Sequence, residues 1–317
     1  MAQILAVTTP FFALVLLGWG AVRLRWLPLD SIPGLNGFVL FFALPCMLFR
    51  FSAITPIAQL LDCAAVGTYL ASAAVMVALA VAFARRRALR WNDASFGALV
   101  AAFPNSGLMG VPLLVALLGP RAAAPAIVAL ALDMVVTTSL CIALSQLGGS
   151  GETRHAVARA LRGMLSNPLP WAIALGTASS ASGLGLPGPL MHGVEMLATA
   201  ASPVALFALG AMLARRTLEA RAPPPGGAVL PLVLHKLLLH PLLVFATGQA
   251  AIAASLPLDP FAAAVLVLLA ALPSASNVPM LAERFRADGG RLARAVLFST
   301  VGAFGSFTAL VAVLQPR

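Results

Sequence analysis

Two apolar runs of the chain are each interrupted by a pair of prolines. The first interruption reads Pro104-Asn105-Ser106-Gly107-Leu108-Met109-Gly110-Val111-Pro112, and the second reads Pro273-Ser274-Ala275-Ser276-Asn277-Val278-Pro279. A helix cannot continue unbroken through either stretch, because proline lacks the N–H donor and its ring clashes with the preceding turn. Inside a bilayer, such broken backbone is tolerated only where protein or a water-filled cavity satisfies its polar groups. Two interruptions in corresponding places of two halves therefore indicate the binding site of a transporter.

The composition places the chain in a membrane. Of its 317 residues, 61% are hydrophobic and only 9% are charged, whereas soluble domains carry about 25% charged residues. The net charge of +10 comes from arginines in short loops between apolar runs, which is typical of membrane orientation rather than of a nucleic-acid partner. The three cysteines lie inside apolar runs, without the spacing of disulfides or metal ligands. The first apolar run lacks a basic start and is long enough to stay in the membrane, so we expect no cleavable signal.

Hydrophobicity predicts ten segments, each near the ~20 residues needed to span a bilayer. They form two groups of five, approximately 3–21, 34–52, 60–84, 94–117 and 122–146, then 166–184, 192–213, 229–252, 260–282 and 292–313.

The arginines support this count and give an orientation. With the N-terminus outside, the predicted inner loops hold sixteen arginines, and the outer side holds three. A missed helix would reverse the side of the membrane assigned to every later loop. A wrong count of helices would therefore not place sixteen arginines on one side and three on the other. We therefore predict a multi-pass protein of the bacterial inner (plasma) membrane with both termini outside. The inner set is Arg23, Arg25, Arg85, Arg86, Arg87, Arg90, Arg154, Arg159, Arg162, Arg215, Arg216, Arg221, Arg284, Arg286, Arg291 and Arg294, and the outer set is Arg50, Arg121 and Arg317.

The two groups of segments resemble each other in sequence. Ala43-Leu44-Pro45-Cys46-Met47-Leu48-Phe49 in segment two is similar to Ala201-Ser202-Pro203-Val204-Ala205-Leu206-Phe207 in segment seven. Because five segments is an odd number, the second copy must insert upside down, as in the inverted repeats of secondary transporters. The predicted fold is an all-α polytopic membrane protein of ten transmembrane helices in two inverted five-helix repeats, with broken helices four and nine. Its parts are a first repeat over 1–148, a cytoplasmic linker over 149–165 and a second repeat over 166–317.

The interruptions supply the predicted substrate site. The half-helices that restart after them would begin near the midplane from opposite sides, and helix N-termini bind anions through free N–H groups and the positive end of the dipole. The predicted substrate contacts are Asn105, Ser106, Gly107, Ser274, Ser276 and Asn277, with Pro104, Gly110, Pro112, Pro273 and Pro279 forming the crossover and hinge. The alternative for these polar residues is that they only cap frayed backbone.

Two charged residues fall inside apolar segments, where ionisable side chains are costly and indicate function by default. Asp133, in segment five, is predicted to carry a coupling proton, to pair with Lys236, or only to hydrogen-bond the broken helix. Lys236, in segment eight, is predicted to balance an anionic substrate, with snorkelling to the interface as the alternative. The flanking His235 and His240 are interpreted as packing or hydrogen-bonding residues. The acids at segment ends are interpreted as interfacial charges.

Function classes other than a carrier are less well supported. The sequence holds no P-loop, nucleophile elbow or zinc motif, which argues against ATP-driven transport and against an enzyme. An intramembrane enzyme would need clustered catalytic groups, and the polar residues here are isolated. An anion channel stays open as an alternative, since saturable flux would be needed to distinguish it from a carrier. We expect no cofactor, no metal and no nucleic-acid partner.

Several motifs together resemble the auxin efflux carrier family over essentially the whole chain. The most specific is Phe103-Pro104-Asn105-Ser106-Gly107-Leu108-Met109-Gly110-Val111-Pro112-Leu113-Leu114. The others are Leu35-Asn36-Gly37-Phe38-Val39 with Ala43-Leu44-Pro45, Asn167-Pro168, Ala205-Leu206-Phe207-Ala208-Leu209-Gly210, and Leu272-Pro273-Ser274-Ala275-Ser276-Asn277 followed by Ala282-Glu283-Arg284-Phe285.

This resemblance implies an architecture and a substrate class. It implies a scaffold of helices 1, 2, 6 and 7, a mobile transport part of helices 3–5 and 8–10, and an elevator-type movement. It implies organic-anion substrates, with malonate- or malate-like carboxylates in the bacterial branch, and Asn105 as a direct contact. The chain lacks the long central loop of many plant members, so auxin is not the expected substrate. The fold is also similar to that of bile-acid sodium symporters, which leaves a sodium-coupled carrier of a more hydrophobic anion as an alternative. Protons and a second copy of the chain are candidate partners.

Overall fold

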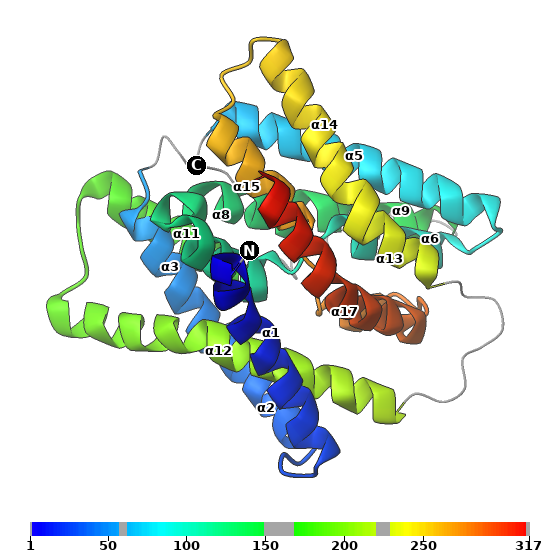
Figure 1. The fold of residues 1–317 in the computed structure, drawn as a ribbon, viewed down its shortest axis with the longest axis horizontal. Helices are drawn as coiled ribbons and strands as arrows, with labels where there is room; N and C mark the ends of the chain where they lie inside the picture. Colours follow the sequence, from blue (N-terminus) through cyan, green and yellow to red (C-terminus); the bar gives the residue numbers. More distant parts are fainter. Residues whose placement is uncertain (1, 57–61, 149–167, 220–228, 315–317) are drawn as a thin grey trace. The chain divides into compact units, whose positions relative to one another are not determined.

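The computed structural model describes residues 2–56, 62–148, 168–219 and 229–314, and every regular element in these ranges is helical (Figure 1). The first half holds α1 (Ala2–Arg23), α2 (Ser31–Phe38), η1 (Val39–Ala43), α3 (Leu44–Ile54), α5 (Cys63–Arg86), α6 (Trp91–Ala102), η2 (Ser106–Gly110), α7 (Val111–Leu118), η3 (Pro120–Ala122), α8 (Ala123–Leu132), η4 (Asp133–Thr137), α9 (Thr138–Ser145) and η5 (Gln146–Gly148). The second half holds α11 (Pro168–Ser182), α12 (Gly188–Glu219), α13 (Leu230–Leu234), η6 (His235–Leu239), α14 (His240–Ala253), α15 (Pro260–Ala270), α16 (Val278–Arg284) and α17 (Gly289–Leu314). The predicted linker over 149–165 lies outside the described residues.

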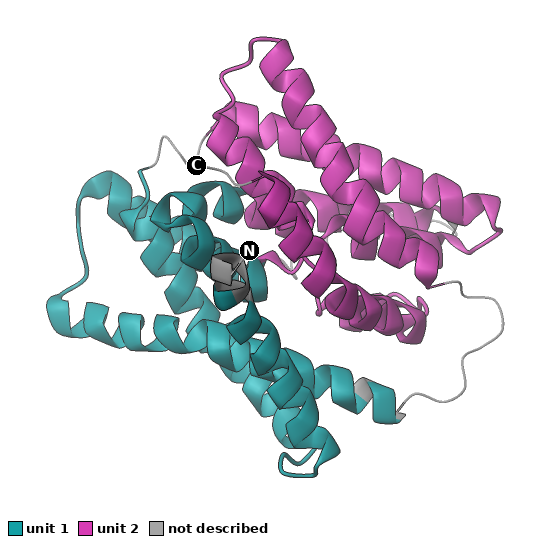
Figure 2. Ribbon diagram, viewed as in Figure 1, with its two compact units in different colours: residues 1–61, 107–128, 165–220 teal, residues 62–106, 129–164, 221–317 magenta. Residues whose placement is uncertain are grey.

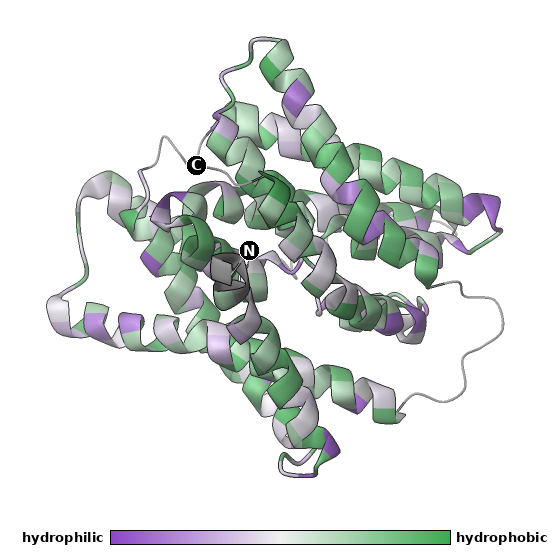
Figure 3. Cartoon of the chain, viewed as in Figure 1, coloured by the Kyte–Doolittle hydropathy of each residue, from purple (hydrophilic) through white to green (hydrophobic). Residues whose placement is uncertain are grey.

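Six helical runs in the described ranges are long and apolar enough to cross a membrane. They are Ser31–Ile54, Cys63–Arg86, Pro120–Ser145, Gly188–Arg215, Leu230–Ala253 and Gly289–Leu314. Most of the length of the helices is coloured hydrophobic, and a group of hydrophilic residues lies at the C-terminal end of α5 (Figure 3). The all-helical, multi-pass prediction is therefore confirmed, whereas the count of ten crossing helices stays a prediction.

The chain divides into two units that interleave along the sequence (Figure 2). Unit 1 consists of 1–61, 107–128 and 165–220, and unit 2 consists of 62–106, 129–164 and 221–317. Each unit draws on both halves of the chain. The second part of the fourth predicted segment belongs to unit 1, whereas its first part belongs to unit 2.

Helices α1 and α12 of unit 1 approach each other so closely that glycine is required on both. A Cβ atom on Gly18 would lie 1.9 Å from the Phe207 carbonyl oxygen, and one on Gly210 would lie 1.8 Å from that of Val15. Small residues at such contacts let helix backbones pack directly in a membrane, where hydrophobic burial does not drive helix association.

Replacing Gly18 with alanine is therefore expected to destabilise unit 1. Overpacking a tight contact costs about 1–3 kcal/mol, because the new methyl group meets main-chain atoms that cannot turn away. Gly20→Ala is the matched control, since a Cβ there meets nothing within 4 Å and alanine favours the helix by about 1 kcal/mol. Thermal unfolding in detergent should show a lower Tm for Gly18→Ala only. Equal Tm values for the two variants would contradict the close packing.

Local sequence sets where the helices of unit 2 begin. The Asp62 carboxylate accepts hydrogen bonds from the N–H groups of Ala64 at 2.9 Å and Ala65 at 3.0 Å, which caps α5. Asp259 caps α15 in the same way, accepting from the Phe261 N–H at 3.1 Å. Such caps satisfy N–H groups that have no partner within the helix. These two acids, interpreted from the sequence as interfacial charges, thus also start helices.

Candidate functional site

The two proline-bracketed interruptions meet within unit 2 and pair through their main chains. Pro104 and Ser274 form an isolated antiparallel bridge. The Asn105 N–H donates to the Pro273 carbonyl at 2.8 Å, and the Ala275 N–H donates to the Phe103 carbonyl at 2.9 Å. Each break therefore satisfies polar backbone of the other, which is the condition for broken backbone at membrane depth. We call this pairing, over residues 103–106 and 273–275, the crossover.

The helices end and restart close to where the prolines predict. Helix α6 ends at Ala102 and η2 begins at Ser106, while α15 ends at Ala270 and α16 begins at Val278. Pro279 lies in the first turn of α16, where the missing N–H of proline costs nothing. Pro112 lies in the first turn of α7, which continues directly from η2 in the helical run Ser106–Leu118. Pro104 and Pro273 lie in the breaks themselves, and Gly110 is the N-cap residue of α7. Two of the predicted hinge residues, Pro104 and Pro273, thus lie in the breaks, and Pro279 begins a helix. Gly110 and Pro112 lie inside the helical run that restarts at Ser106.

Asn105 is the one predicted contact with a buried, unsatisfied donor. Its side chain is 3% exposed, and its Nδ2 atom has no hydrogen-bond partner among the described residues. Leaving a buried amide donor without a partner costs about 1–3 kcal/mol, so this side chain favours a ligand that can accept a hydrogen bond. The main chain of the crossover is paired, so the free group is on the side chain.

The other predicted contacts differ in their surroundings. The Ser106 hydroxyl donates to the Pro104 carbonyl at 3.3 Å. Ser299 of α17 positions Ser274, because its hydroxyl oxygen accepts from the Ser274 N–H at 3.2 Å while the hydroxyl donates to the Val296 carbonyl at 2.9 Å. Ser276 is buried, Gly107 is partly buried and Asn277 is exposed. Asn277 occupies the N-cap position of α16 without a side-chain capping bond, so capping does not explain its side chain.

Asp133 lies at the start of η4 and is fully buried. Its carboxylate accepts hydrogen bonds from the Tyr69 hydroxyl at 2.7 Å and the Thr137 hydroxyl at 3.1 Å. Two donors suit an ionised carboxylate, which can only accept. Asp133 makes no ion pair with Lys236 among the described residues, although the two charges interact electrostatically.

Lys236 lies in η6 and is also fully buried, so it does not snorkel to an interface. Its Nζ atom lies 2.9 Å from Nδ1 of His240 and donates to the Ala270 carbonyl at 3.0 Å. Ala270 is the last residue of α15, and the last carbonyls of a helix have no partner within it. Lys236 therefore satisfies the end of the broken ninth segment and puts a positive charge at the negative end of its dipole.

Tyr69 and His240 join the two charged residues into one buried array. The rings of Tyr69 and His240 lie with centroids 6.4 Å apart, and Nε2 of His240 is buried without a partner among the described residues. The sequence pattern does not mark Tyr69 as a site residue, and it predicts a packing or hydrogen-bonding role for His240. Tyr69 is the only tyrosine of the chain, and a phenol in an apolar segment needs a hydrogen-bond partner, which could have signalled it.

Both charged residues sit on π-helical turns. Asp133 opens η4, and Lys236 is the second residue of η6. Single π turns inside α-helices are rare and frequently occur at functional sites. In unit 2 both turns hold buried polar residues of the array, Asp133 in η4 and Lys236 in η6.

Comparisons with known proteins match this chain to membrane transporters, and the family model covers nearly all of it. Residues 4–311 match the family model described as "Membrane transport protein". A protein of Rhizobium meliloti (strain 1021) named "Putative malonate transporter" is 29% identical over 320 residues, which covers 99% of this chain and 97% of that protein. "Uncharacterized transporter YfdV" of Escherichia coli (strain K12) is 28% identical over 287 residues, 87% of this chain and 86% of its own length. "Auxin efflux carrier component 3" of Arabidopsis thaliana is 29% identical over 154 residues, 46% of this chain and 23% of the plant protein.

Proposed function

Because the chain belongs to the Membrane transport protein family, together with the auxin efflux carriers, we propose that it carries small organic anions of the malonate or malate kind. The observation that supports this most is the free Nδ2 donor of Asn105 beside the paired backbone of the crossover. A carboxylate accepts hydrogen bonds only, so it complements a buried donor. The name of the Rhizobium meliloti relative points to the same substrate class.

The proposed architecture is ten helices in two inverted five-helix repeats. Two findings support it: helices lie over each of the ten predicted segments, and the two interrupted segments pair in antiparallel fashion. An inverted repeat brings its corresponding segments together in opposite directions.

The proposed transport cycle is an elevator-type movement of unit 2 relative to unit 1. The division of the chain supports this, since unit 1 contains α1, α2, α3, α11 and α12, which are the proposed scaffold. Unit 2 contains the crossover, the array of Asp133 and Lys236, and most of the proposed transport helices, whereas residues 107–128, which include α7, belong to unit 1. The substrate contacts of the crossover and the charged array would then move together.

The proposed function is tested by the flux of labelled malonate and malate into proteoliposomes. A carrier should show saturable uptake that is accelerated when unlabelled substrate is loaded inside. Flux that stays linear with concentration and ignores internal substrate would indicate the anion channel instead. Absence of flux for both acids would overturn the malonate and malate assignment. Uptake of a more hydrophobic anion that requires sodium would instead support the alternative of a sodium-coupled carrier.

Asp133 gives a test of proton coupling. Import of a dianion against an inside-negative potential is opposed by about 2.3 kcal/mol per charge per 100 mV, so a co-transported proton would favour it. We expect Asp133→Asn to abolish the acceleration of uptake by an inward proton gradient, because the amide cannot take up the proton. Uptake by wild type and variant is measured with and without the gradient. An unchanged gradient response in Asp133→Asn would leave Asp133 with a structural role alone.

A further inference from the structure

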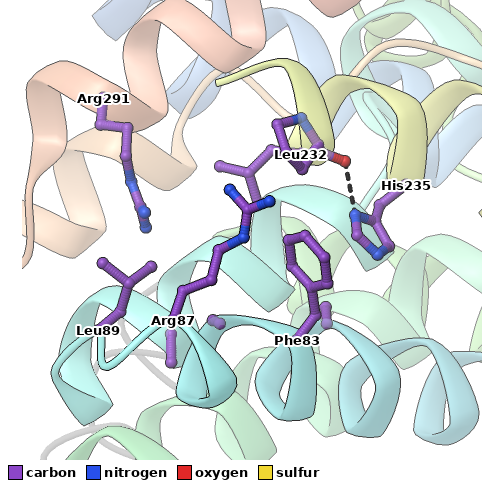
Figure 4. Close-up of a pocket in the computed structure, with 10 residues that line it drawn as sticks. Phe83, Arg87, Leu89, Leu232, His235 and Arg291 are labelled. Atoms are coloured by element: carbon purple, nitrogen blue, oxygen red, sulfur yellow. Dashed lines mark hydrogen bonds between the residues drawn. The ribbon is translucent and has the colours of Figure 1, made fainter. Parts of the chain in front are cut away.

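A separate pocket in unit 2 is lined by positive side chains that the transport proposal does not use (Figure 4). It lies between the C-terminal end of α5, the start of α6, the turns of α13 and η6, and the start of α17. The arginine distribution predicts that these ends face the cytosol. The labelled residues around the pocket are Phe83, Arg87, Leu89, Leu232, His235 and Arg291.

Arg87 brings an unpaired guanidinium to this pocket. It is exposed, and its guanidinium carbon lies 4.6 Å from the centre of the Phe83 ring. Among the described residues it has no hydrogen bond or ion pair. The neighbouring Arg85 differs, since it donates to the Leu89 carbonyl at 2.6 Å and lies over Trp91. Arg87 is therefore held in place by an aromatic contact while its N–H donors stay free.

Arg291 reaches the same pocket from α17, and Figure 4 shows both guanidinium groups extending into the space between their helices. Arg291 is 4% exposed. Its Nη2 donates to the Asp93 carbonyl at 2.7 Å, but its Nε is buried without a partner among the described residues. A buried charged donor without a partner is costly, so the Nε of Arg291 favours an acceptor that enters the pocket.

The nearby acids do not supply that acceptor. The Asp93 carboxylate binds Arg90 at 3.1 Å and the Asp288 N–H at 2.8 Å. The Asp288 carboxylate accepts from the main-chain N–H of Arg291 at 2.8 Å. Within the described residues, neither carboxylate makes an ion pair with the guanidinium of Arg87 or Arg291. The pocket thus offers two guanidinium groups to an anion from outside the chain.

We propose that this pocket binds the phosphate of an anionic phospholipid headgroup in the inner leaflet. Guanidinium groups match phosphate oxygens with two parallel hydrogen bonds, and basic pockets between membrane helices on the cytoplasmic side bind such headgroups. The apolar members of the lining, Phe83, Leu89 and Leu232, suit the lipid beyond its phosphate better than a free, fully hydrated anion. The bound headgroup bridges the end of α5 and the start of α17.

The test measures binding of dioctanoyl phosphatidylglycerol to the detergent-solubilised full chain by native mass spectrometry, with dioctanoyl phosphatidylcholine and inorganic phosphate as comparison ligands. Arg87→Ala is expected to weaken phosphatidylglycerol binding on the order of tenfold, as the loss of one charge-assisted contact would. Arg86→Ala is the matched control, because it removes the same charge from the same exposed helix end outside the pocket. Arg291→Lys should also weaken binding, because lysine keeps the positive charge but lacks the planar N–H donors of the guanidinium group.

Three outcomes would overturn the proposal. If Arg87→Ala and Arg86→Ala weaken phosphatidylglycerol binding equally, the lipid is attracted to the positive charge of the loop in general and not to this pocket. Equal affinity for phosphatidylcholine would remove the requirement for an anionic headgroup. Binding of inorganic phosphate that depends on Arg87 and is not displaced by phosphatidylglycerol would assign the pocket to a soluble phosphate. Because the measurement is made without substrate, its result is independent of the proposed transport function.

Discussion

Replacing Asn105 with alanine is expected to lower kcat/KM for malonate uptake by about 10- to 100-fold while leaving Tm nearly unchanged. A hydrogen bond to a charged ligand is worth about 1.5–3 kcal/mol, and each 1.4 kcal/mol is a factor of ten. The fold should not suffer, because Nδ2 of Asn105 has no partner within the described chain to lose. Removing an unsatisfied buried donor is neutral or favourable for stability.

This separation of transport from stability distinguishes substrate contact from capping. Uptake into proteoliposomes and thermal unfolding are measured on the same preparations. Asn36→Ala serves as the matched control, since its amide donates a long hydrogen bond to the Met212 sulfur at 3.9 Å, within unit 1 and away from the crossover. If Asn105→Ala lowers Tm by several degrees and its flux falls in parallel, the side chain supports the backbone, and the proposed contact is wrong.

Lys236→Met is expected to destabilise the protein by about 3–5 kcal/mol, the range seen when one partner of a buried charged group is removed. The change leaves the Ala270 carbonyl without its donor and the buried Asp133 without the nearby positive charge. Unfolding in detergent and the yield of folded protein report this loss.

A double variant separates these two causes. In Lys236→Met with Asp133→Asn, both charges are gone, so part of the stability should return, by at least about 1 kcal/mol if the sites are coupled. Asp133→Asn alone is the reference for additivity. Strict additivity of the two changes would mean that Lys236 only caps α15 and does not balance Asp133.

The breaks could be predicted from the sequence, whereas their pairing could not. Pro104 and Pro273 exclude continuous helices by local sterics alone, and the structure has breaks beside both residues. The bond from the Asn105 N–H to the Pro273 carbonyl joins positions far apart in the chain, and no local pattern encodes such a contact.

The array of Asp133 and Lys236 shows the same limit of sequence reasoning. Hydrophobicity marks both residues as unusual, but it does not tell on which side of a helix a side chain packs. Lys236 points inward because the π turn η6 and the carbonyl of Ala270 give it a buried place. Gly18 and Gly20 look alike in sequence, yet only Gly18 lies against another helix.

The pairing at the crossover has a consequence for how selectivity can change over evolutionary time. The bonds between residues 103–105 and 273–275 use main-chain atoms, which every residue except proline supplies equally. Side-chain substitutions at Asn105 or Ser276 therefore leave those bonds in place. Under the proposed function, the main-chain bonds of the crossover stay the same while the side chains that contact the substrate can change. Related chains can therefore change their anion specificity through few substitutions, without a change of fold.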